Sequence, residues 1–218
     1  KNTSINIDFS KNKTKISSKG DYSFKNEYDK FNFEIVKNKN DLIFDTEVEI
    51  DFSPIILKDI NYNKKKNIYS ELKFNGQIFE NKNIKFKNIK LLESQNNLSL
   101  SNLFLTKQFK IIDFDKLELN YLNNYKKINQ LRVTKKNKKF LLLSDNFDGK
   151  SIIINLLKTD SKSNILKRFK NLNSEIVLNF DHFFIDDKDY LKKIRGNIII
   201  EKNKIKYGNI SAKLNNKH

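Results

Sequence analysis

The sequence predicts an all-β protein, a long antiparallel meander curled into a hydrophobic groove, with one or two short helical turns near residues 150–169. Two observations carry this prediction. Apolar and polar residues alternate with a period of two through most of the chain, as in half-buried strands. The segments between these alternations are short, polar and rich in asparagine, which tolerates the backbone angles of tight turns.

The clearest strand covers residues 42–52. Its apolar face carries Leu42, Phe44, Val48, Ile50 and Phe52, with Thr46 as the only polar member, and its other face carries Asp45, Glu47, Glu49 and Asp51. At ~3.3 Å per residue, such a strand spans roughly 35 Å. This is long for a strand of a globular protein.

The same alternation recurs from one end of the chain to the other. It includes Ile5, Ile7 and Phe9; Phe31, Phe33 and Ile35; Leu72, Phe74 and Ile78; Leu117, Leu119 and Tyr121; Ile176, Leu178, Phe180 and Phe184; Ile194, Ile198 and Ile200; and Ile210, Ala212 and Leu214. Between residues 84 and 91 the apolar phase shifts by one residue, which predicts a β-bulge near Asn88. About ten or eleven strands are expected.

Short breaks at residues 37–40, 63–66, 137–138 and 202–204 predict hairpins. Few connections are long enough for a crossover, so we expect the sheet to be antiparallel. The exception is the stretch at 149–157 and 164–169, which predicts helical turns. No linker rich in Gly, Pro or Ser divides the chain, so residues 1–218 are predicted to form one unit. Because the chain starts at Lys1 and contains no methionine, we expect it to be a segment of a longer protein.

A sheet with one apolar face must cover that face by forming a sandwich, a barrel or a trough around something apolar. The long strands favour the trough. Its expected lining is Leu42, Phe44, Val48, Ile50, Leu72, Phe74, Ile176, Leu178, Phe180, Ile198 and Ile200. Periodicity alone does not separate a dry core from a lipid groove.

The net charge of +17 comes from an excess of lysine. Arginine, whose planar group binds phosphate with two parallel hydrogen bonds, occurs only at positions 132, 168 and 195. The lysines are scattered, and the abundance of Lys, Asn, Ile and Phe is typical of drift in an A/T-rich genome. We therefore expect a solvated outer face and no nucleic-acid partner. Because the chain has no cysteine, it can form no disulfide.

No residues form a recognisable catalytic or metal site. His182 shares the phase of Phe180, so we expect it on the inner face of a strand, and a lone histidine without cysteine cannot build a usual zinc site. Residues 186–189 lack the glycine and distal glutamate of a calcium loop, and predict a turn. Residues 145–149 predict a turn that ends at Gly149 and caps the following helix. We expect neither enzyme activity nor a cofactor.

Residues 128–214 resemble the AsmA-like family of Gram-negative envelope proteins, which includes the TamB and YhdP types. The resemblance rests on two strands around Leu131-Arg132-Val133 and Phe140-Leu141-Leu142-Leu143, on the run from Asp145 to Ser151 that leads into an apolar turn, and on the strands at 173–185, 190–201 and 204–214. Residues 1–127 match only in their strand rhythm. The chain has less Gly and Ala than is usual in the family.

The resemblance implies a repeating β-groove in the periplasm, anchored to the inner membrane through regions outside this segment. It also implies that the groove carries phospholipid acyl chains toward the outer membrane without catalytic residues. Two alternatives stay open on the residues alone: a structural or adhesive β-domain with a dry core and, after it, a basic nucleic-acid-binding domain.

Overall fold

The structure is a computed structural model that describes residues 3–24, 26–123, 126–157, 165–185 and 189–215. It is almost entirely β, with one large sheet of 14 strands, a separate two-stranded pair and a few short helical turns. The strands are β1 (Ser4–Ser10), β2 (Lys13–Phe24), β3 (Glu27–Lys37), β4 (Asp41–Glu49), β5 (Ile55–Leu57), β6 (Tyr62–Lys64), β7 (Ser70–Phe79), β8 (Ile84–Glu93), β9 (Asn96–Leu105), β10 (Ile111–Asp113), β11 (Lys116–Leu122), β12 (Ile128–Lys136), β13 (Lys139–Asp148), β14 (Ser174–Phe184), β15 (Tyr190–Glu201) and β16 (Lys204–Leu214). The helices are α1 (Lys150–Leu157) and the short 3-10 helices η1 (Lys58–Ile60) and η2 (Ile165–Arg168).

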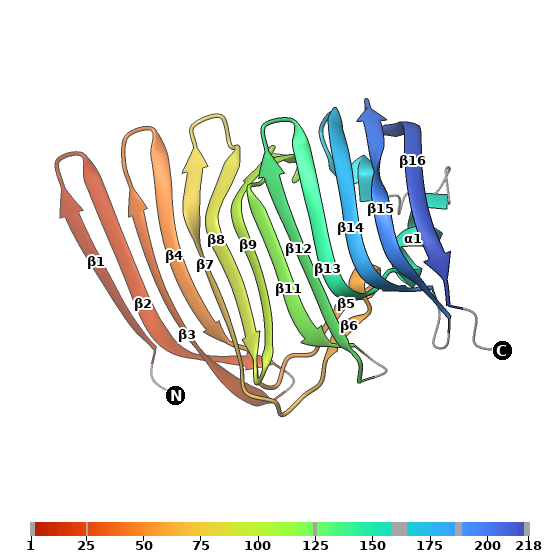
Figure 1. The fold of residues 1–218 in the computed structure, drawn as a ribbon. Helices are drawn as coiled ribbons and strands as arrows, with labels where there is room; N and C mark the ends of the chain where they lie inside the picture. Colours follow the sequence, from red (N-terminus) through yellow and green to blue (C-terminus); the bar gives the residue numbers. More distant parts are fainter. Residues whose placement is uncertain (1–2, 25, 124–125, 158–164, 186–188, 216–218) are drawn as a thin grey trace.

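The large sheet is open and follows the order of the chain. Its strands pair in the order β1-β2-β3-β4-β7-β8-β9-β11-β12-β13-β14-β15-β16, with β10 attached to β9. The small β5–β6 pair lies outside this order. Figure 1 shows the strands side by side, with β1 and β16 at the two edges. The predicted all-β meander is confirmed, with more strands than expected; three of them, β5, β6 and β10, are only three residues long.

One pair departs from the predicted antiparallel arrangement. β13 and β14 are parallel, with Phe140 opposite Ile176 and Leu142 opposite Leu178. Parallel neighbours need a crossover connection, and here it contains α1 and η2. The predicted helical turns near 150–169 therefore exist in the described part of that stretch, and the connection that contains them makes the sheet mixed.

Most predicted turns are confirmed. The turn at 37–40 joins β3, which ends at Lys37, to β4, which begins at Asp41. The β12–β13 hairpin turns at Asn137 and the β15–β16 hairpin at Lys202 and Asn203, and each of these three residues has a positive φ. The hairpin predicted at 63–66 is wrong, because these residues end the short strand β6 and lead toward β7. Residues 186–188 lie outside the described residues, so the turn predicted there is not tested.

Bulges keep the apolar residues on one face of the sheet. Asn75 of β7 pairs with Asn88 of β8 and Gly76 pairs with Phe86, so Lys87 is one extra residue of β8 against β7. The pairing of β8 with β9 also skips Lys87, together with Asn102, whose φ is 52°. This confirms the bulge predicted near Asn88. One extra residue reverses the alternation, so Phe86 and Ile89 share a face although they are three residues apart.

A second row of irregularities crosses β13, β14 and β15. The pairing skips Asp145, Asp181 and Lys193, and the core residue that follows Phe180 on its strand is Phe183. The prediction that His182 and Phe184 continue the inner face is therefore wrong. His182 lies outside the core against the ring of Tyr190, with centroids 5.4 Å apart.

The turn predicted at 145–149 is also wrong, because residues up to Asp148 belong to β13 and Phe147 is buried in the core. The predicted capping role has a counterpart, since Asp148 Oδ1 accepts a hydrogen bond from the Lys150 amide, 3.3 Å away, at the start of α1. After Asp148 the chain therefore turns at Gly149 and continues as α1, whose apolar residues Ile152 and Ile153 pack on the apolar face of the sheet.

That face is covered over part of its area. Residues 50–69, which include β5, η1 and β6, pack with α1 onto the apolar side of the middle and C-terminal strands; we call these segments the cover (Figure 1). The resulting core contains Ile50, Tyr62, Leu91, Leu98, Leu119, Tyr121, Leu131, Val133, Phe140, Phe147, Phe180, Phe183 and Ile194.

Gly149 provides a test of how tightly the cover packs. A Cβ atom at this position would lie 1.7 Å from Phe183 Cζ, whereas a Cβ at Gly208 would meet nothing closer than 3.8 Å. Because overpacking a core is destabilising, we expect Gly149→Ala to lower the free energy of unfolding by about 1–3 kcal/mol. Gly208→Ala, the control, should change it by less than about 0.5 kcal/mol. Urea unfolding followed by circular dichroism measures both, and equal midpoints would contradict the packing described.

Candidate functional site

The apolar face of the sheet has a covered and an uncovered part. The uncovered face lies on β2, β3, β4, β7 and β8, outside the core cluster formed with the cover. It consists of Ile16, Phe31, Phe33, Ile35, Leu42, Phe44, Phe74, Ile78, Ile84, Phe86 and Ile89, and every one of them except Phe44 is half-buried rather than buried. A contiguous apolar surface of this kind is typical of an interaction site.

Cross-strand pairing places these side chains next to one another. Phe31 lies opposite Val48, Ile35 opposite Phe44, and Ile78 opposite Ile84. Such directly opposite pairs contact one another through the sheet face, so the row of apolar residues in each strand becomes a two-dimensional patch.

Three phenylalanine rings form the centre of the uncovered face. The ring of Phe44 lies 6.1 Å from that of Phe74 and 5.5 Å from that of Phe86, in edge-to-face arrangements that aromatic pairs favour. Gly76 makes room for this cluster, because a Cβ there would come within 2.9 Å of Phe44 Cζ and 2.2 Å of the Lys85 carbonyl oxygen. The centre of the face is therefore aromatic.

The structure divides the predicted groove residues between the two parts. Leu42, Phe44 and Phe74 belong to the uncovered face. Ile50 and Phe180 are in the covered core, and Val48, Leu72, Ile176 and Leu178 pack against it. Ile198 is half-buried and Ile200 is buried, on the same side of the sheet as Ile176. The residues predicted to line one groove thus share one face, but the cover occupies that face at most of them.

A buried lysine holds part of the cover in place. Lys64 is fully buried, and its Nζ donates hydrogen bonds of 3.0 Å each to the carbonyl oxygens of Asp51, Ser53 and Lys65. These three acceptors match the three N–H donors of an ammonium group. Burial lowers the pKa of Lys64, and the nearby carboxylates of Glu93, Asp51 and Asp29 oppose that shift.

Asp29 ties the start of the cover to the sheet. Its carboxylate accepts hydrogen bonds from the backbone N–H groups of Asp51 and Phe52, at 3.0 and 3.3 Å. The Asp51 carboxylate in turn accepts the Ser70 N–H at 2.7 Å. The loop that leaves β4 and returns at β7 is therefore closed by carboxylates that satisfy its otherwise unpaired backbone donors.

Two tyrosines join the cover to the middle of the sheet. The hydroxyl of Tyr62 donates to Glu93 Oε2 at 2.6 Å, and the hydroxyl of Tyr121 donates to the Ile60 carbonyl oxygen. Their rings meet edge to face with centroids 5.3 Å apart. Burial raises the pKa of both hydroxyls, and the hydrogen bond to Glu93 raises that of Tyr62 further.

Asp148 also holds the cover against the sheet. Its Oδ2 accepts hydrogen bonds from Asn61 in the cover, at 2.8 Å, and from Asn123 at 3.1 Å. Its backbone N–H donates to Asn129 Oδ1 at 2.8 Å. The side-chain amides of Asn61 and Asn123 and the backbone N–H of Lys150 all donate to the Asp148 carboxylate. Asp148 therefore joins the cover, the sheet and the start of α1.

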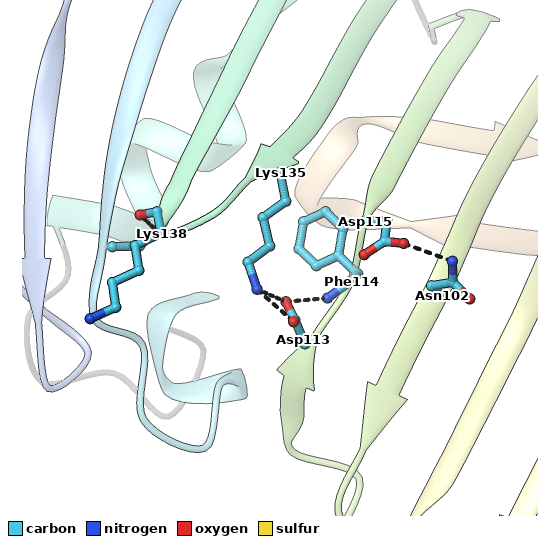
Figure 2. A network of polar contacts seen from close by, with 7 residues as sticks. Asn102, Asp113, Phe114, Asp115, Lys135 and Lys138 are labelled. Atoms are coloured by element: carbon cyan, nitrogen blue, oxygen red, sulfur yellow. Dashed lines mark hydrogen bonds and ion pairs between the residues drawn. The ribbon is translucent and has the colours of Figure 1, made fainter.

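A further polar network closes the far end of the covered core. Figure 2 shows Lys135 of β12 against the carboxylate of Asp113, with Nζ 2.5 Å from both oxygens, while Asp115 accepts a hydrogen bond from Asn102 at 2.7 Å. Beside them the rings of Phe114 and Phe140 stack with centroids 5.0 Å apart. Lys135 and Asp113 remain partly exposed, so this ion pair lies at the surface, beside the stacked rings, and contributes little to stability.

Sequence reasoning missed the residues that anchor the cover, although a signal for them was present. Asp29, Ser70, Glu93 and Asn129 each continue an apolar row of a strand, in phase with Phe31, Leu72, Leu91 and Leu131 respectively. A polar residue in an apolar phase must find a buried partner, because an unpaired buried polar group is costly. These interruptions therefore marked the end of the sheet where the cover attaches.

The outer face of the sheet is charged and internally paired. Lys15 lies 2.8 Å from Glu34, Lys73 lies 3.1 Å from both Glu47 and Glu71, and Lys139 lies 2.7 Å from Glu175. These pairs are exposed and contribute little to stability. They do, however, partly neutralise the lysines that carry the excess positive charge.

The described residues contain no cluster of three or more His, Asp or Glu side chains that could hold a metal ion. None of the helices in that part of the chain has the length and apolar character needed to span a bilayer. Comparison with protein-family models, with curated proteins and with solved structures gave no match in any of the three. The fold and the face thus define a class, an open β-sheet protein with a partly covered apolar face, and the function is argued from that face.

The buried tyrosines predict loss of stability at alkaline pH. Above the ordinary tyrosine pKa of 10.0 the unfolded chain releases phenolic protons that Tyr62 and Tyr121 keep in the folded chain. The free energy of unfolding should therefore fall as pH rises above about 10, by up to ~1.4 kcal/mol per pH unit for each tyrosine. Lys64 acts in the opposite direction, because its lowered pKa makes the unfolded chain bind more protons.

Urea unfolding of the parent and of Tyr121→Phe between pH 8 and 11 isolates one tyrosine, since Lys64 is common to both proteins. We expect a shallower decline in Tyr121→Phe, whatever its stability at pH 8. Tyr207→Phe, at an exposed position on β16, is the matched control and should decline like the parent. Parallel pH profiles for the parent and Tyr121→Phe would show that the tyrosine is not held neutral by the fold.

Proposed function

We propose that this chain is a non-enzymatic, lipid-binding segment of an AsmA-like envelope protein, in which the uncovered face holds phospholipid acyl chains during passive transport between the inner and outer membranes. The observation that carries the proposal is the uncovered face itself, an apolar surface on five strands with three phenylalanines at its centre. The resemblance of residues 128–214 to that family supplies the envelope setting, with anchoring to the inner membrane through other regions of the parent protein.

The chemistry of the face suits an acyl chain. Burial of each CH₂ group contributes about 0.8 kcal/mol, so an apolar strip of this length can retain a lipid tail without any polar contact. Ser18, Thr46 and Gly76 lie in the same rows. The other residues of the face are Phe, Ile and Leu, which offer similar contact at most positions along the strip. A lipid could therefore move along the strip without a deep energy minimum, as a conduit requires.

The cover adds a feature that a uniform groove would not have. Because Tyr62, Lys64 and α1 occupy the C-terminal part of the face, lipid contact is proposed for Phe33, Phe44, Phe74 and Phe86 and not for Phe180. The segment would then hold lipid over its N-terminal half and be closed over the rest.

A structural β-domain is the second candidate, and the covered core favours it. Phe147, Phe180 and Phe183 pack together with ring centroids 5.3–6.0 Å apart, as in an ordinary dry core. The third candidate, a nucleic-acid-binding domain, has less support, because outer-face lysines such as Lys15, Lys73 and Lys139 lie in ion pairs with glutamates.

Native mass spectrometry of the chain purified from cells without detergent tests the lipid proposal. We expect adducts of phospholipid mass on the parent protein and their loss in Phe74→Lys, because a charged group on the face opposes burial of an acyl chain. The control is Ile43→Lys, which places the same charge on the opposite face of the adjacent strand β4, at an exposed residue. It should retain the adducts.

Circular dichroism must show that both variants keep the β-structure of the parent. A lipid-free mass for a folded parent protein would contradict the proposal and favour the structural domain. Equal loss of adducts in both variants would also contradict it, since binding would then not depend on the uncovered face.

A further inference from the structure

The buried serines of the chain differ in whether their hydroxyl groups are paired. Among the described residues, Ser18, Ser70, Ser144 and Ser174 are buried. In Ser70, Ser144 and Ser174 the hydroxyl donates a hydrogen bond to a backbone carbonyl oxygen. Ser18 is only 4% exposed, and its hydroxyl has no hydrogen-bond partner in that part of the chain. A buried polar group without a partner is uncommon in proteins and requires a physical explanation.

Ser18 lies in the rows of the uncovered face, close to a second hydroxyl. Phe33 of β3 lies opposite Ser18 of β2 on one side and opposite Thr46 of β4 on the other. Thr46 is half-buried, and its hydroxyl also lacks a partner among the residues that the structure describes. The two side chains are two strand spacings apart, roughly 10 Å. Both lie in the part of the sheet that the cover does not reach (Figure 1).

The covered part of the same face shows what such polar positions bind. Asp29 interrupts an apolar row and accepts the backbone N–H groups of Asp51 and Phe52, while Glu93 interrupts another and accepts the Tyr62 hydroxyl. Each of them therefore pairs with a polar group of the segment that covers the face at that point. We expect Ser18 and Thr46, in the same way, to pair with a polar group of the molecule that covers the uncovered face.

The surroundings of the two hydroxyls favour a neutral acceptor. The nearest positions on the same face are apolar or glycine, namely Ile5, Ile7, Ile16, Gly20, Phe31, Phe33, Ile35, Phe44, Val48 and Phe74. None of these residues carries a positive charge, so a phosphate or carboxylate placed among them would be a charge without a counter-ion. An ester carbonyl oxygen accepts a hydrogen bond from a hydroxyl without bringing a charge. In a phospholipid this acceptor is joined directly to an acyl chain.

We propose that Ser18 and Thr46 form a polar subsite of the uncovered face and donate hydrogen bonds to the ester carbonyl oxygens of a bound phospholipid. The acyl chains then lie on the apolar residues around Phe74 and Phe86, toward the cover. Ile5, which lies opposite Ser18 and is 63% exposed, has room to move aside when the ester binds. This inference rests on the proposed lipid binding, to which it adds a preference for ester-linked lipids.

Competition between two lipids tests the subsite. The probes are two phospholipids with the same head group and chain length, one with ester and one with ether linkages, presented to the protein as an equimolar mixture in vesicles. Native mass spectrometry distinguishes their adducts by mass. We expect the parent to prefer the ester by about fivefold, because the ether offers no carbonyl oxygen to the hydroxyls. The preference should disappear in Ser18→Ala/Thr46→Val through weaker binding of the ester.

Ser17→Ala is the matched control, because Ser17 is the neighbouring residue on β2 and lies on the outer face, opposite Glu34. It should keep the ester preference of the parent. Urea unfolding of the lipid-free proteins separates binding from a structural role of the hydroxyl. Ser18→Ala should unfold at the same or a higher urea concentration than the parent, because the substitution removes a buried hydroxyl that has no partner.

The outcomes separate this inference from the proposed function. A parent that binds the ester and the ether equally would overturn the subsite and leave the lipid binding intact, whereas a parent that binds neither lipid would contradict both. An ester preference that survives in Ser18→Ala/Thr46→Val would overturn the subsite. So would a lipid-free Ser18→Ala protein that is less stable than the parent, since its hydroxyl would then have a partner within the fold.

Discussion

The structure depends on one constraint: a single-layer sheet with one apolar face needs other segments to cover that face. In this chain the segments that do so are short compared with the sheet. Among the described residues, residues 50–69 and α1 leave the sheet and pack back onto it, and Leu172, in the segment that follows η2, packs against the same core. They cover the strands from the middle of the sheet to β15 and leave β2 to β8 partly open. The division into a dry core and an uncovered face follows from where these two segments can reach.

The cover is held by polar contacts as much as by apolar ones. Lys64 is satisfied by three carbonyl oxygens, Asp29 by backbone amides of the loop, and Asp148 by the side chains of Asn61 and Asn123. In a low-dielectric interior such networks are stabilising when fully paired and costly when broken. The cover is therefore attached in one position, and the boundary between the covered and uncovered parts of the face is defined.

Much of the fold could be predicted from the sequence. The period of two identified the strands, the asparagine-rich breaks identified most of the hairpins, and the phase shift near Asn88 identified a bulge. The errors lie where a local pattern has two structural solutions. Residues 145–148 have turn-forming chemistry but extend β13, and the bulges at Asp181 and Lys193 move Phe183 to the core in place of His182. A one-residue slip in a strand exchanges its faces, and short-range propensity does not reveal it.

The sequence by itself determined the class of fold, the apolar face and the charged face, because these follow from alternation along each strand and need no knowledge of distant contacts. It also contained the polar interruptions at Asp29, Glu93 and Asn129, without their partners. Only the tertiary structure decided which part of the apolar face is covered, that β13 and β14 are parallel, and that β1 and β16 are edges of opposite direction. These properties arise from contacts between residues far apart in the chain, such as Asn61 with Asp148, and a local pattern carries no information about which distant segment satisfies it.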